Sequence, residues 1–160
     1  MINLFDFVTD RTYADYQRWL TLRDKGWQNM TDEERAEWNR GMKGAYNSSD
    51  LSRVSEVVRL IKDELTQCGY LGYVEFNVRK TWSGRDVPTA AEFTDYLKGV
   101  ETVRAALAQF PTTPKTPADT GSLDFQGAND IEKILIDIDE LIKKMRAARF
   151  FGGDLYGGEI

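Results

Sequence analysis

Five acidic side chains near the end of the sequence come closest to a chemical site by residue type and spacing. They are Asp130, Glu132, Asp137, Asp139 and Glu140. Carboxylates gathered in one place bind divalent metals or transfer protons. Here the spacing spreads them around the outside of a helix, where charge is ordinarily a solvated face. The D-x-D-x-D-G pattern of a calcium loop is also absent. We therefore expect a solvated face and no metal site.

The residues that most enzymes use for proton transfer are missing. There is no histidine, which removes Ser-His-Asp and Cys-His mechanisms and the commonest metal ligand. Cys68 is the single cysteine, so an intramolecular disulfide and a multi-cysteine zinc site are excluded, and we expect a buried thiol. The GGDLYGG stretch lacks the Gly-Lys-Ser/Thr of a phosphate loop. No catalytic residue and no cofactor are expected.

Composition indicates a globular protein of one domain. The 160 residues are 41% hydrophobic and 29% charged, with a formal net charge of −5. Acidic and basic residues are interleaved, which disfavours nucleic-acid binding because that requires a basic stripe. No apolar run approaches the roughly 20 residues of a membrane span.

The most regular element is a helix predicted over residues 128–149. Apolar residues recur in it at steps of three and four, which places them on one face that must be buried. These residues are Ile131, Ile134, Leu135, Ile138, Leu141, Ile142 and Met145. Acidic residues near its start and basic residues near its end complement the helix dipole.

Four further helices are predicted upstream, over about residues 13–25, 32–41, 49–67 and 90–109. Capping-box patterns mark three of the starts, at Thr12, Thr31 and Thr89. Gly26 and Gly69 are natural helix stops.

Three segments are predicted to be extended. Residues 73–79 alternate apolar and polar types, which is typical of a strand, and a lone strand needs a partner such as the N-terminal arm or a neighbouring chain. Residues 111–127 carry prolines three apart, which predicts a spacer of polyproline type. Residues 150–160 form a glycine-rich tail.

The expected fold is therefore mainly α. It is a bundle of about five helices with one or two short strands and an extended C-terminal tail. Residues 1–110 form the N-terminal helical part, 111–127 the linker, and 128–160 the long helix with its docking tail, all within one compact domain.

Several stretches resemble a family of small proteins encoded in the tail and baseplate region of phages and prophages of Gram-positive gut bacteria. They are FVTDRTYADYQRW, NMTDEERAEWNRGMKGAYNSSDLSRV, VPTAAEFTDYLKGVETVR, GANDIEKILIDIDELI and FFGGDLYGGEI. The resemblance spans nearly the whole chain and departs mainly at residues 69–80, where the strand-like insert is longer. It implies a component of the virion or of its assembly, and no catalytic residue.

Two functions follow as expectations. The first is a tail-tip, baseplate or adaptor protein that is located in the virion, assembles in the bacterial host cytoplasm, forms a homo-oligomer and docks to other tail or baseplate proteins, with no nucleic-acid or membrane partner. The alternative is a small soluble phage protein that inhibits a host enzyme, although mixed charge weakens mimicry of nucleic acid. A wall hydrolase is weaker still, because no carboxylate pair is marked by sequence.

The residues expected to make the docking contacts lie in the tail and in the predicted strand. They are Phe150, Phe151, Leu155, Tyr156, Ile160, Tyr73 and Phe76. The tail carries apolar residues at spaced positions but contains too many glycines to be self-supporting, so we expect it to dock on a partner chain or on the bundle, as an added strand beside residues 73–79.

Overall fold

The structure, a computed structural model, describes the backbone of residues 6–73, 75–119 and 123–154, with side chains up to Ala148. The described chain is mainly helical, which confirms the expected fold class. Its elements are α1 (Tyr13–Lys25), the short 3-10 helix η2 (Trp27–Asn29), α2 (Asp32–Asn39), α3 (Ser48–Gln67), α4 (Ala90–Ala105) and α5 (Phe125–Asp154).

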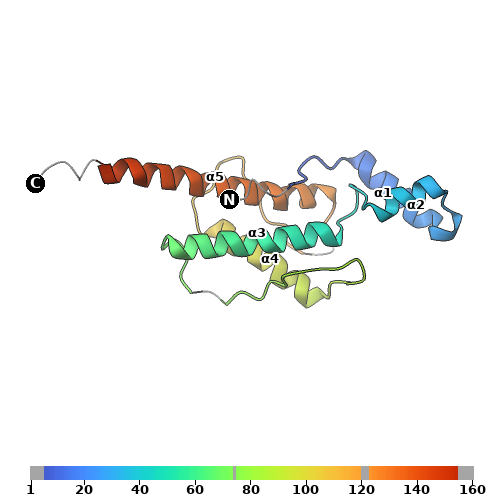
Figure 1. Cartoon of the computed structure of the whole chain (residues 1–160), viewed down its shortest axis with the longest axis horizontal. Coiled ribbons are helices and arrows are strands. Elements are labelled where there is room, and N and C mark those ends of the chain that lie inside the picture. The colour runs from blue at the N-terminus through green and yellow to red at the C-terminus, as the bar shows by residue number, and fades with distance from the viewer. Residues whose placement is uncertain (1–5, 74, 120–122, 155–160) are drawn as a thin grey trace, which may run out of the picture.

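The molecule is elongated, with a three-helix bundle in the middle (Figure 1). Helices α3, α4 and α5 all contact one another and make up this bundle. Helices α1 and α2 form a head at one end, while α5 extends past the other helices at the opposite end. The two ends of the bundle therefore differ in what they present to a partner.

Helices α1, α2, α3 and α4 each begin at a capping box, a pair of local hydrogen bonds between side chains and backbone. Capping boxes at Thr12, Thr31 and Thr89 are present, as the sequence predicts, and Asn47 makes a fourth with Asp50. In each box the side chain of the third helical residue also bonds the backbone of the cap, so two otherwise unpaired N–H groups are satisfied.

The bundle core is formed where the apolar faces of α3, α4 and α5 pack against one another. Buried residues come from α3 (Leu51, Val54, Val57, Val58, Ile61, Leu65), α4 (Phe93, Tyr96, Leu97, Val100, Val103) and α5 (Ile131, Ile134, Leu135, Ile138, Ile142). Each stripe follows the three-and-four spacing read from the sequence, and each α-helix buries its stripe against the other two.

The head has a small core of its own. Leu22, Met30 and Met42 are buried there, with Trp19 and Trp38 packed beside them. The backbone comes very close to itself at Gly44, where an added Cβ would lie 2.0 Å from the carbonyl oxygen of Asp15. That contact fixes how the segment before α3 runs past α1.

The predicted strand at residues 73–79 is wrong. In the described part of this stretch the chain forms no strand. Residues 75–82, which we call the strap, lie against helices instead: Phe76, Val78 and Trp82 pack on the bundle core. The alternation of inward and outward side chains holds from Glu75 to Val78, but helices rather than a second strand cover the inward face.

The region around the proline-rich segment packs closely. Helix α4 ends at Ala105, earlier than expected, and Gln109 Nε2 donates to the carbonyl of Leu107 at 2.7 Å. Within the linker, the Pro114 carbonyl accepts from Arg104 Nε at 2.9 Å, and Thr113 Oγ1 donates to Asp137 at 2.7 Å. The described linker residues are therefore held against α4 and α5.

Helix α5 is longer than the predicted 128–149. It starts at Phe125 and continues to Asp154. Glycine disfavours a helix by only about 1 kcal/mol relative to Ala, so Gly152 and Gly153 do not by themselves end it. Residues 150–154 are thus helical rather than extended tail.

Candidate functional site

The densest cluster of charged side chains lies where the segment before α1 crosses α3 and α5. Glu132 on α5 is fully buried. Its carboxylate accepts from Arg11 Nη2 at 2.9 Å, from Arg53 Nη2 at 2.8 Å and from the backbone N–H of Val8 at 2.7 Å. Asp50 on α3 completes the cluster, 3.1 Å from Arg11 and 2.5 Å from Arg53.

Neighbouring polar groups fix this cluster in place. The Asn129 side chain on α5 accepts from the Arg11 backbone N–H at 3.0 Å and donates to the Arg11 carbonyl at 2.9 Å. The Arg11 guanidinium also lies over the ring of Tyr46, 5.6 Å from its centre. Arg11 is therefore held through both its backbone and its side chain.

The charges of the cluster neutralise one another locally. Burial lowers the pKa of Arg53, but hydrogen bonds to Glu132 and Asp50 outweigh it, so the pKa of Arg53 is raised and it stays charged. Next to the cluster, Tyr46 and Tyr96 share a hydrogen bond between their hydroxyls. Burial raises the pKa of both phenols well above the ordinary value, so both stay neutral.

This arrangement is suited to holding elements together. Both carboxylates are shared by the two guanidinium groups, and Arg11 and Glu132 are buried. The cluster links three parts of the chain that are distant in sequence: the segment before α1, the first turns of α3 and the start of α5. Its chemical role is to lock these elements, because removing one partner from a buried ion pair is costly.

The predicted solvated acidic face is wrong for two of its five residues. Glu132 is fully buried and Asp137 is 2% exposed, where Lys133 and Thr113 bind it. Glu140 is exposed as expected, and Asp130 and Asp139 are half-buried. Contacts from α3, α4 and the preceding segments cover more of α5 than a single stripe, so acids beside the stripe are buried too.

No group of three or more metal-ligating side chains is found among the described residues. Cys68, expected to be buried, is half-buried near the end of α3.

The second feature of interest is the free end of α5. Arg146 forms an ion pair with Glu64 in the last turn of α3, and Lys144 lies 4.8 Å from the ring centre of Phe110. From Arg146 the helix continues eight residues, to Asp154. At 1.5 Å per residue this is roughly 12 Å. In Figure 1 no other described element runs beside that stretch.

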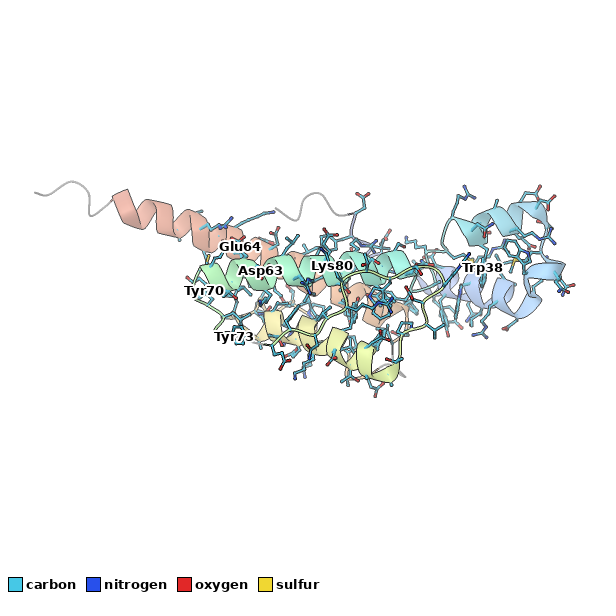
Figure 2. All side chains as sticks on the ribbon, turned by 60° about the horizontal axis from the view of Figure 1, so that its bottom comes forward. Trp38, Asp63, Glu64, Tyr70, Tyr73 and Lys80 are labelled. Carbon is cyan, nitrogen blue, oxygen red and sulfur yellow. The ribbon has the colours of Figure 1, made fainter. Side chains whose placement is uncertain are left out.

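A small apolar groove lies at the same end of the bundle. It is lined mostly by apolar side chains, together with the ion-paired Glu64 and Arg146; the other lining residues are Leu65, Cys68, Tyr70, Ile142 and Met145. Figure 2 shows Tyr70 and Tyr73 at this end, close to where α3 finishes. Tyr70 is 51% exposed and Tyr73 98% exposed. Aromatic rings this exposed are typical of protein interfaces.

The residues predicted to dock are placed as follows. Phe150 and Phe151 lie in the projecting part of α5, and nothing further is described of their side chains. Leu155, Tyr156 and Ile160 lie outside the described residues. Tyr73 is exposed, whereas Phe76 packs on the bundle core. Local sequence patterns do not reveal the buried charges, because Arg11 and Glu132 are 121 residues apart.

None of the described helices combines the length and the apolar composition needed to cross a membrane. Comparison with protein-family models, with curated proteins and with solved structures found no match to this chain.

Proposed function

We propose that the protein is a non-catalytic structural component that works by docking to other proteins. The observation that carries this proposal is the projecting part of α5, which extends roughly 12 Å past its last ion pair with α3. An isolated stretch of helix is marginally stable in water, so it gains most from a partner. Phe150 and Phe151 lie in that stretch of the sequence, and they are the apolar residues that we propose for the contact.

The buried cluster of charged side chains supports the same proposal. The buried carboxylates Glu132 and Asp50 are both bound by Arg11 and Arg53, an arrangement that holds elements rigidly together. A rigid body with one projecting helix fits a building block of a larger assembly. Together with the resemblance to phage tail and baseplate proteins, this suggests a tail-tip, baseplate or adaptor component that forms homo-oligomers and docks to other virion proteins.

The test is the composition of purified particles. Particles from a host that carries the gene are purified by density gradient, and the protein is quantified against the major tail protein. We expect a fixed copy number per particle. A protein that is abundant in the lysate but absent from the particles would contradict the proposal and favour the soluble inhibitor of a host enzyme.

A further inference from the structure

The segment before α1 runs antiparallel to α5. The backbone of Arg11 exchanges two hydrogen bonds with the Asn129 side chain, at 3.0 and 2.9 Å. Earlier in the chain, the Val8 backbone N–H donates to Glu132 Oε2 at 2.7 Å. Phe7, the next residue in this direction, is half-buried and packs on the bundle core. Going backwards along the segment, its contacts therefore advance towards the C-terminal end of α5.

This path follows the seam between α3 and α5. The two helices lie side by side in the bundle (Figure 1). The oxygen of Glu132 that accepts from the Val8 N–H also accepts from Arg53 Nε of α3, at 3.2 Å. Val8 is therefore fixed at the line where the two helices meet, and the residues before it continue along that line.

Apolar side chains border the seam beyond Val8. Leu60 lies two turns beyond Arg53 on the same face of α3, and Ile136 lies one turn beyond Glu132 on the same face of α5. Both Leu60 and Ile136 are half-buried. The faces that carry buried charges at one end of the seam therefore become apolar farther along it.

The seam opens here into a groove, which we call the seam groove. It is lined by Leu60, Ile61, Asp139, Ile142 and Lys143, together with the ion pair of Glu64 and Arg146. The other two charged residues of the lining also pair with each other, Lys143 Nζ lying 2.5 Å from Asp139. Because these charges are neutralised within the chain, the groove is suited to an uncharged, apolar occupant.

Residues 1–5, which lie outside the described residues, have the matching composition and length. Their sequence, MINLF, has no charged side chain, and four of the five residues are apolar. Lys143 lies eleven residues beyond Glu132, roughly 16 Å along the helix. The seven residues before Val8 span up to about 23 Å when extended. The chain is therefore long enough to follow the seam to the far end of the groove.

We propose that residues 1–5 occupy the seam groove of their own chain, antiparallel to α5. Asp6 is exposed and Phe7 is turned to the core, so in an extended arm Phe5 is the next side chain to face inward. Val8 is already fixed at the entrance of the groove, which keeps the arm at a high effective concentration there. The arm of a second copy lacks that advantage.

This inference does not rest on the proposed function. Docking through the projecting part of α5 concerns residues beyond Arg146, whereas the arm covers the seam before that point. Absence of the protein from particles leaves the covered groove intact, and an uncovered groove leaves docking through α5 intact.

The test is the reactivity of a cysteine in the wall of the groove. Leu60→Cys is made in a Cys68→Ser background, which removes the single native cysteine. Its rate of reaction with a maleimide is compared between the full chain and a chain that lacks residues 2–5. We expect the full chain to react at least about tenfold more slowly, because the arm must open before the reagent enters. Ile136→Cys reports from the opposite wall and should behave alike.

Thr66→Cys in the same background is the matched control. Thr66 is exposed near the end of α3 and is not part of the groove lining, so removal of the arm should leave its rate unchanged. A second pair of variants keeps the full length of the arm, in case the shortened chain does not fold. Phe5→Ser should speed the labelling of Leu60→Cys, whereas Asp6→Ser, at an exposed position, should not. Circular dichroism verifies that each variant is folded.

Two results would overturn the proposal. One is a labelling rate of Leu60→Cys that is the same in folded chains with and without the arm, and the same with Phe5→Ser. The other is protection that disappears when the protein is diluted until light scattering shows a monomer. In that second case the groove is covered by the arm of another copy and not by the chain's own.

Discussion

Glu132 is a single charged residue that holds several elements together through its hydrogen bonds to Arg11 and Arg53. It sits among the apolar residues of α5, and its carboxylate is bound by Arg11 and Arg53 with no exposure to solvent. The periodicity of the helix alone places Glu132 on the exterior, because its two partners come from distant parts of the sequence. Burial of a charge depends on such partners, and these are invisible to local periodicity.

Replacing Glu132 by glutamine should be strongly destabilising. Glu132→Gln keeps the shape but leaves Arg11 and Arg53 with a single carboxylate, Asp50, between them. Breaking a buried ion pair costs about 3–5 kcal/mol. Urea unfolding followed by circular dichroism measures the change in the free energy of unfolding.

The control is Glu140→Gln on the same helix. Glu140 is exposed and pairs with Lys144 one turn away, an arrangement worth about 0–1 kcal/mol. Equal losses for the two variants would show that Glu132 is not held as described.

At the scale of elements, helix starts were the easiest features to read. A capping box involves residues three apart, so the sequence displays the whole interaction at Thr12, Thr31 and Thr89. The end of α5 differs from the prediction, because the helix runs five residues past the predicted Arg149 to Asp154. No box or proline marks that end, and propagation of an existing helix is easy.

The capping boxes predict loss of stability in acid. Backbone and side-chain hydrogen bonds from Thr89 lower the pKa of Glu92 below its ordinary 4.5, and hydrogen bonds from Thr12 lower that of Asp15 below 3.8. A group whose pKa is lowered by folding stabilises the fold above its unfolded pKa. That contribution disappears as pH falls through the lowered pKa.

Unfolding free energies measured from pH 7 downwards should therefore fall below about pH 4.5. Glu92→Gln should flatten part of this decline, because the substituted side chain no longer titrates. A decline of unchanged steepness in Glu92→Gln would contradict the contribution assigned to that box.

The sequence predicts that the strap is extended, but it wrongly predicts that the strap is a strand. The alternation of apolar and polar types in the sequence predicts an extended segment with an inward face, but it does not show that helices lie beneath that face. The contact that decides this is at Gly99, where an added Cβ would lie 2.4 Å from Val78 Cγ2. Only a residue without a side chain lets the strap lie this close to α4.

A double-mutant cycle tests the seating of the strap on α4. Gly99→Ala should destabilise the protein by about 1–3 kcal/mol through overpacking. In a Val78→Ala background the obstructing methyl is gone, so the penalty of Gly99→Ala should shrink, with a coupling of about 0.5–3 kcal/mol. Strict additivity of the two substitutions in urea unfolding would argue that Val78 does not lie over Gly99.

At the scale of the whole molecule, two ends with different surfaces flank one rigid bundle (Figure 1). The head has its own small core, and the other end presents the projecting part of α5 beside exposed Tyr70 and Tyr73. The sequence indicated apolar residues around position 150 and assigned them to an extended tail. In the structure Phe150 and Phe151 belong to the helix, so docking through them would present a helix to the partner.

The most direct test of docking through this end is a truncation after Arg149, scored by incorporation into purified particles. The truncation removes Phe150 and Phe151, while the bundle core, which extends only to Ile142, stays whole. Val87→Ser, which alters a side chain that is 85% exposed in the α3–α4 connection, is the control for loss of an apolar surface group elsewhere. We expect the truncated protein to keep its helical circular dichroism and to be lost from particles, while Val87→Ser is retained. Incorporation of the truncated protein at the wild-type copy number would contradict docking through the end of α5.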